Sequence, residues 1–120
     1  MTKELLKEFL EYIAKVNEYS YISFYHGISH WKHVEAFGLM MAERCPAADK
    51  EVIRWFAYLH DSMRGSEGND TSHGASAARF INKIRNTFLK DLSDEQIHTL
   101  KLACKTHDVK RSTGNLTADI

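Results

Sequence analysis

Proline, cysteine and net charge are all scarce in this sequence, and each shortage excludes a class of protein. A single proline, Pro46, in 120 residues leaves most of the chain free to be helical. Cys45 and Cys104 are too few and too far apart for a zinc ribbon or a disulfide scaffold, so we expect a reducing compartment, the cytoplasm. The charges of the 16 basic and 16 acidic residues cancel, which argues against a net positive charge that would attract nucleic acid or anionic lipid.

Long hydrophobic runs are also missing. No segment approaches the roughly 20 apolar residues that a membrane-spanning helix needs, and the segment 1–17 carries too many acidic residues for a secretory signal. The remaining composition is ordinary, with 43% hydrophobic and 27% charged residues over a length that suits one core. We therefore expect a single domain over residues 1–120 with no membrane partner.

Hydrophobic periodicity predicts an all-α fold. Apolar residues recur at spacings of three and four, and a polar stretch over 62–72 reads as a loop. Short connections then imply a helical bundle of five or more helices around one core. Five segments carry the helical pattern: 2–19, 30–46, 49–61, 73–89 and 93–107.

Capping residues mark where these helices should begin. Ser29 and Asp49 precede two of the periodic segments, and Ser93 with Gln96 forms a capping box before the last. The second segment places Phe37 and Met41 on its apolar stripe, and the pair Met40-Met41 is expected to fill the core.

Four histidines fall at helix ends in an alternating order. His30 begins the second helix, His60 and Asp61 end the third, His73 begins the fourth and His107 ends the fifth. Consecutive helices joined by short loops run antiparallel, so the start of one lies beside the end of the next. The helix order therefore predicts that these side chains meet around a pocket at one pole of the bundle.

A metal ion is the simplest explanation for such a cluster. A single histidine at a helix end is more often a partly buried side chain than a ligand. Burying several imidazoles and a carboxylate together, however, costs several kcal/mol unless pairing, hydrogen bonds or a metal offsets it. Imidazole and carboxylate ligands suit zinc, iron, manganese, cobalt or nickel, and the missing thiolates argue against a closed structural zinc site.

The same residues resemble a known family, the HD-domain superfamily of metal-dependent phosphohydrolases. The similarity extends over roughly residues 20 to 110 and rests on an ordered set of His, His-Asp, His-Gly and His at helix ends. Four segments carry it: YHGISHWKHV at 25–34, AYLHDSMR at 57–64, DTSHGASAARF at 70–80 and ACKTH at 103–107.

The resemblance implies an HD-type bundle in which His30, His60 and Asp61 bind a divalent metal (Mn, Fe, Co, Ni, Zn or Mg). His73 and His107 occupy positions that hold a second metal or the substrate phosphate in related proteins.

His26, four residues before His30, is expected off the helix because Gly27 and Ser29 follow it, and is interpreted as a support or substrate contact. The last ligand of the superfamily is an aspartate on a later helix. Asp119 is the candidate here, and a truncated chain that lacks this aspartate is the alternative.

Phosphoester hydrolysis is the chemistry that such a site predicts. A divalent ion lowers the pKa of bound water from about 15.7 towards 7 and polarises a phosphoryl oxygen. Asp61 would serve as ligand and electrostatic anchor. Arg64 either binds phosphate or is a solvated loop residue, and Asp70 either orients a ligand histidine and accepts a proton or caps the next helix. Trp31 or Tyr25 stacks on a nucleobase or packs in the core.

The function expected from the sequence is therefore hydrolysis of a phosphoester or phosphoanhydride in a small molecule such as a nucleotide. The alternative is a catalytically silent HD-like module that binds a metal or ligand and lacks the final aspartate. Nucleic acid is not an expected partner: the basic residues along 79–90 are read as a solvated face, and His98 as a solvated side chain.

Overall fold

The computed structural model describes residues 1–23, 26–63 and 73–107, and this part of the chain contains six helices and no strand. The all-α prediction is thereby confirmed. None of the described helices is both long and apolar enough to cross a bilayer. In chain order the helices are α1 (Lys3–Val16), α2 (Glu18–Ile22), α3 (Ile28–Ala42), α4 (Lys50–Leu59), α5 (His73–Ile84) and α6 (Asp94–Thr106).

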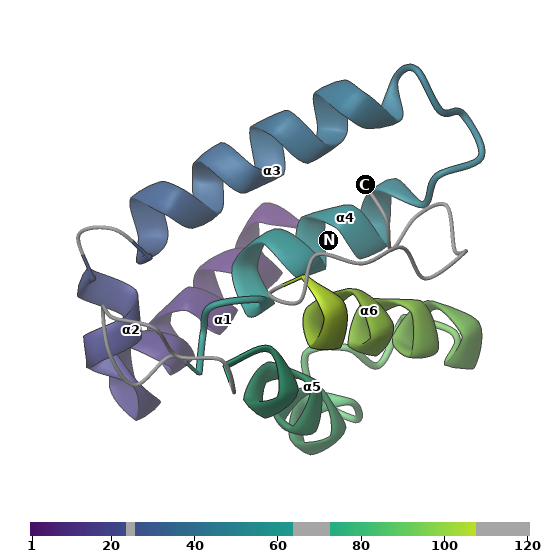
Figure 1. Ribbon diagram of the computed structural model, residues 1–120. Helices are drawn as coiled ribbons and strands as arrows, with labels where there is room; N and C mark the ends of the chain where they lie inside the picture. Colours follow the sequence, from purple (N-terminus) through teal and green to yellow (C-terminus); the bar gives the residue numbers. More distant parts are fainter. Residues whose placement is uncertain (24–25, 64–72, 108–120) are drawn as a thin grey trace.

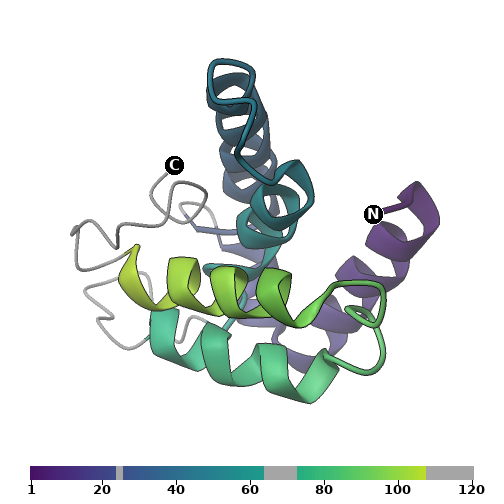
Figure 2. The ribbon, with the colours of Figure 1, turned by 90° about the vertical axis from the view of Figure 1, so that its right-hand side faces the viewer.

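Two antiparallel helix pairs form the frame of the molecule. α3 lies on the outside against α4, and α5 lies beside α6 (Figures 1 and 2). α4 also packs on α6, which joins the two pairs. The start of α3 therefore lies at the end of α4, and the start of α5 at the end of α6. Both junctions lie at the same side of the bundle.

α4 is the central helix and is buried on nearly all sides. Trp55 of α4 meets Phe9 of α1 edge-on at 5.3 Å, and the same Phe9 ring lies edge-on to Phe88, in the segment after α5, at 5.6 Å. Such pairs bury large apolar areas and hold their partners in fixed orientations. The residues that follow α4 are consequently carried into the interior. The buried residues of α4 are Val52, Ile53, Trp55, Ala57, Tyr58 and Leu59.

Two of the three predicted caps are confirmed. The Asp49 carboxylate accepts hydrogen bonds from the backbone N–H groups of Glu51 and Val52 at 3.0 and 3.2 Å. Ser93 and Gln96 form the reciprocal capping box. Ser29, however, lies inside α3, and Gly27 is the N-cap. The helix begins earlier than the sequence suggests, because the backbone N–H of Trp31 already donates to the Gly27 carbonyl at 3.0 Å.

Two predicted helices are shorter than expected. The segment 2–19 breaks at Asn17, whose side chain accepts from the Ser20 N–H and donates to the Ser62 carbonyl at 2.9 Å. An asparagine side chain that bonds locally offers the backbone an alternative to the helix. The segment 73–89 ends as a helix at Ile84, and turns follow it.

The buried face of α3 differs from the predicted one. Phe37, Met40 and Met41 are 61%, 54% and 46% exposed, whereas Trp31 and Ala42 are fully buried. The helix approaches α4 through small residues: a Cβ added to Gly38 would lie 2.6 Å from Ile53 Cγ2. The expectation that the Met40-Met41 pair fills the core is therefore wrong, because these two side chains point outward while Gly38 and Ala42 face α4.

This arrangement predicts unequal effects of substitutions on opposite faces of α3. Phe37→Ser should change the free energy of unfolding by no more than about 0.5 kcal/mol, because the side chain is already largely in water. Trp31→Ala should cost about 3–5 kcal/mol by removing a fully buried ring. Chemical denaturation of the two variants measures both values. A loss of several kcal/mol in Phe37→Ser would contradict the exposed placement.

Candidate metal centre

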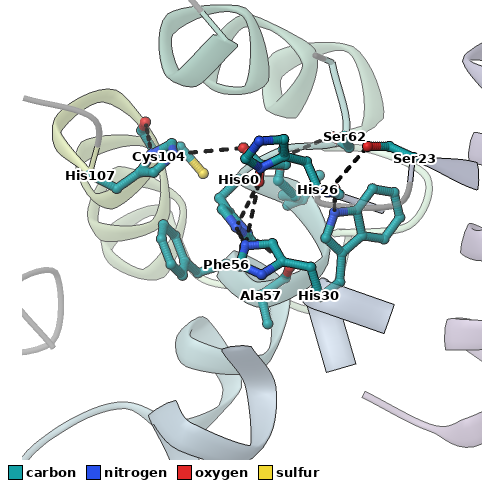
Figure 3. Close-up of polar contacts among 12 residues, drawn as sticks. Ser23, His26, His30, Phe56, Ala57, His60, Ser62, Cys104 and His107 are labelled. Carbon is teal, nitrogen blue, oxygen red and sulfur yellow. Dashed lines mark hydrogen bonds and ion pairs between the residues drawn. The ribbon is translucent and has the colours of Figure 1, made fainter. Parts of the chain in front are cut away.

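The imidazoles of His26, His30, His60 and His107 gather in one place (Figure 3). Each has a ring nitrogen within 3.9 Å of the Asp61 carboxylate. Asp61 Oδ2 lies 3.3 Å from His60 Nε2 and 3.5 Å from both His30 Nε2 and His26 Nδ1. Asp61 Oδ1 lies 3.9 Å from His107 Nε2. His30 Nε2 and His60 Nε2 are themselves 3.3 Å apart. The carboxylate therefore directs one oxygen to three imidazoles and the other oxygen to the fourth.

The helix frame accounts for most of this convergence. His30 lies in the first turn of α3, His60 caps the end of α4, and His107 caps the end of α6. These positions, with Asp61, meet as the alternating order of helix starts and ends predicts. His73 begins α5, and its side chain lies outside the described residues. A Cβ on the next residue, Gly74, would lie 3.3 Å from His107 Cε1, so the start of α5 borders the cluster.

Backbone carbonyls fix how two of the rings are oriented. His60 Nδ1 lies 2.9 Å from the Ala57 carbonyl and 3.1 Å from the Phe56 carbonyl. His107 Nδ1 lies 2.8 Å from the Cys104 carbonyl. Because a carbonyl only accepts, each Nδ1 is assigned a proton, which leaves the Nε2 of each ring facing Asp61 and available as a ligand atom. Metal-binding histidines are oriented in this way, by a hydrogen bond from the second ring nitrogen.

Two acceptors meet at His30. With the proton assigned to Nδ1, His60 presents the lone pair of Nε2 to His30, and the Asp61 carboxylate offers a second acceptor. One Nε2–H on His30 can satisfy one of these acceptors with good geometry. Protonating His30 fully is disfavoured, since burial and then the neighbouring His60 lower its pKa. A cation held between these atoms would engage all of the acceptors at once.

The spacing of the ligand atoms also suits a metal. Donors about 2.1 Å from an ion lie about 3.0–3.4 Å from one another in octahedral or tetrahedral arrangements. The set His30, His60 and Asp61 has separations of 3.3 to 3.5 Å. A second set, His26, His30 and Asp61, has all ligand atoms within 4.8 Å. Because the two sets share His30 and Asp61, the cluster offers up to four donors, which are three imidazoles and the Asp61 carboxylate.

The cluster is buried on one side and open to solvent on the other. The side chains of His60 and Asp61 are each 5% exposed, whereas that of His30 is 37% exposed. A carboxylate this buried needs compensating partners, and the four imidazoles are placed to provide them. The open side lies at His30 and is the direction from which a small molecule can approach.

His26 is more central than the sequence suggests. It precedes α3, as expected, yet it lies as close to Asp61 as His30 does. Its loop is held by two contacts: its carbonyl accepts the Trp31 indole N–H at 2.6 Å, and its N–H donates to Ser23 Oγ at 3.1 Å. Trp31 is thus fully buried and packs in the core, and the interpretation that it stacks on a nucleobase is wrong.

The remaining candidates fall into two groups. Arg64, Asp70, Tyr25 and Asp119 lie outside the described residues, so their expected roles stay predictions. Cys104 lies inside α6, where burial and then the Asp61 carboxylate raise the pKa of its thiol. A protonated, buried thiol is a poor metal ligand. Cys104 contributes instead through its carbonyl, a backbone role that no sequence signal marks.

The lowered pKa of His30 predicts how the metal-free fold responds to acid. Folded His30 takes up a proton less readily than the unfolded residue, whose pKa is 6.5. Its contribution to stability is therefore present above that pH and is lost as the pH falls through the folded pKa. With a chelator present, we expect a lower Tm near about pH 5.5 than near about pH 7.5.

Two variants check this origin. His30→Gln should reduce the difference between the two melting temperatures, whereas His98→Gln, at an exposed site on α6, should leave it unchanged. An undiminished difference in His30→Gln would show that other groups control the acid response.

No family model, curated protein or solved structure matches this chain.

Proposed function

We propose that this chain is a divalent-metal-dependent phosphohydrolase of the HD type that acts on a small phosphoester. One observation carries the proposal: a buried carboxylate stands among four imidazoles at separations that suit metal ligands. The ordered His, His-Asp, His-Gly and His motifs support the same reading through their resemblance to HD-domain proteins. Fold and motif alone do not define the chemistry, which depends on the residues of the site.

His30, His60 and Asp61 are the residues proposed to hold the ion, and His26 is placed to join them. When bound, such an ion lowers the pKa of a water and polarises a phosphoryl oxygen. The Ala57 and Phe56 carbonyls hold His60 in the orientation that ligation needs. The negative charge of Asp61 would offset the charge of the ion in the buried part of the site, where little water can do so.

His107 is proposed to serve the second oxygen of Asp61. Its Nε2 is 3.9 Å from Oδ1, its ring centroid lies 5.3 Å from that of His60, and its side chain is one-fifth exposed. It is therefore placed to bind a second ion or an oxygen of the substrate phosphate. The reaction adds water across the ester: the water oxygen bonds to phosphorus, the bond from phosphorus to the leaving oxygen breaks, and that oxygen takes a proton.

The cytoplasm is the proposed location, because both cysteines are free thiols and a reducing compartment keeps them so. A nucleotide is one member of the substrate class. The nitrogen and oxygen donors of the cluster can bind Mn, Fe, Co, Ni, Zn or Mg. Elemental analysis of the purified protein identifies which of these ions is bound.

The test uses the full chain, stripped with a chelator and then supplied with single divalent metals. We expect bound metal by elemental analysis, a Tm that rises with metal concentration, and hydrolysis of p-nitrophenyl phosphate that the chelator abolishes. His98→Ala is the matched control, since this exposed histidine lies outside the cluster and should change none of the three.

The other outcomes are equally informative. Metal bound at the cluster without turnover of an aryl phosphate or a nucleotide panel would favour the catalytically silent module. Metal content that falls in His98→Ala and persists in His60→Ala would overturn the proposed site, because the ion would then sit on a surface histidine.

A further inference from the structure

A hollow of about 500 Å³ lies beside the cluster, between the end of α2 and the first turns of α3. This volume is within the range of small-molecule sites, roughly 300–1,000 Å³. The hollow and the cluster share one residue, His30, whose Nε2 faces His60 and Asp61. His30 is also the open side of the cluster, so a molecule held at the cluster can extend directly into the hollow.

The lining of the hollow has a distinctive chemistry. Tyr21, Ile22 and Ile28 supply apolar surface, and Ser29 and His33 supply uncharged hydrogen-bonding groups. Among the described residues that line it, none is a lysine, an arginine, an aspartate or a glutamate. The described lining residues offer a carboxylate no opposite charge, so a charged group gains less from this surface than an uncharged one does. An uncharged ring, by contrast, gains apolar burial and has polar groups at its edge.

We infer that this hollow binds the organic part of the substrate, and that this part is an uncharged, ring-sized group esterified to the phosphate. The inference rests on the proposed function, since it assumes that the phosphate lies at the cluster. It adds a substrate preference. A phosphate ester of an uncharged ring is preferred over a phosphate ester whose organic part carries a carboxylate.

Two non-hydrolysable ligands that differ by one charge test this preference. Phenylphosphonate and 4-carboxyphenylphosphonate share the same ring and phosphonate, and calorimetry on the Mn²⁺-loaded full chain gives the Kd of each. We expect the carboxylate to weaken binding by at least about tenfold. Ile22 lies at the rim and is 65% exposed, so it tolerates substitution. Ile22→Lys should reduce the difference to about threefold or less by supplying a counter-charge, whereas Ile22→Gln, uncharged and of similar length, should retain it.

The outcomes separate this inference from the proposed function. Equal affinities in the wild type, or an Ile22→Lys variant that discriminates as strongly as Ile22→Gln, would overturn the preference while phenyl phosphate is still hydrolysed. Failure to bind either phosphonate and failure to hydrolyse phenyl phosphate with any divalent metal would overturn both. Hydrolysis of phenyl phosphate and 4-carboxyphenyl phosphate, run alongside, should show the same order in kcat/KM.

Discussion

Asp61→Asn should lower the affinity for a divalent metal by at least about a hundredfold, because substitution of residues that merely support ligands already costs 10- to 100-fold. The amide keeps the shape of the carboxylate but removes its charge and replaces one oxygen with a donor. The new NH2 group replaces either Oδ2, which contacts His26, His30 and His60, or Oδ1, which faces His107. Competition against a fluorescent chelator measures the change.

A second measurement separates the ligand role from a structural one. The Tm of Asp61→Asn in chelator measures the structural cost of losing the buried carboxylate, apart from its effect on metal binding. Asp91→Asn, which removes the same charge at an exposed position, should leave the metal affinity unaltered. An Asp61→Asn variant that binds metal within about threefold of the wild type would rule out Asp61 as a ligand.

Gly74→Ala should lower the free energy of unfolding by about 2–4 kcal/mol. A Cβ at this position would lie 2.2 Å from the Cys104 carbonyl oxygen and 3.3 Å from its carbon. Both are backbone atoms, so α5 and α6 must move apart. Because the same Cβ would lie 3.3 Å from His107 Cε1, metal affinity should fall as well.

Gly38→Ala is the matched control within a helix. Its added Cβ would meet a side-chain methyl, Ile53 Cγ2, rather than backbone atoms, so a small shift of one side chain can relieve the contact. The contact cost is partly offset by the better helix propensity of alanine, worth about 1 kcal/mol. Urea denaturation should therefore show a loss of about 1 kcal/mol or less. Equal losses in the two variants would contradict the close approach of α5 and α6.

Local chemistry explains which parts of the fold the sequence predicts. Asp49 and Ser93 are recognisable as caps because their hydrogen bonds reach only two or three residues along the chain. Gly27 as the cap of α3 is not, since it depends on the closure of the preceding loop. The face of α3 was predicted from its large side chains, while the contact with α4 uses Gly38 and Ala42, which carry little hydrophobic signal.

The cluster divides in the same way. His30, His60, Asp61 and His107 could be predicted to meet from the order of helix starts and ends alone. His26 could not, because its position depends on a hydrogen bond from the Trp31 indole and on the absence of a side chain at Gly27, where a Cβ would lie 2.3 Å from the Ser23 carbonyl oxygen. The roles expected of Arg64, Asp70 and Asp119 remain predictions.

The carbonyls that orient His60 and His107 belong to the last turns of their own helices, α4 and α6. Helix ends open and close far more often than whole domains unfold. Each opening breaks the Nδ1 hydrogen bond and releases an imidazole from Asp61 while the core stays intact. Because the end of α4 is buried whereas His107 is one-fifth exposed, fraying of α6 should limit the lifetime of the assembled cluster. Slow amide hydrogen exchange at His60 and His107, whose N–H groups bond to the Phe56 and Ala103 carbonyls, would report directly on it.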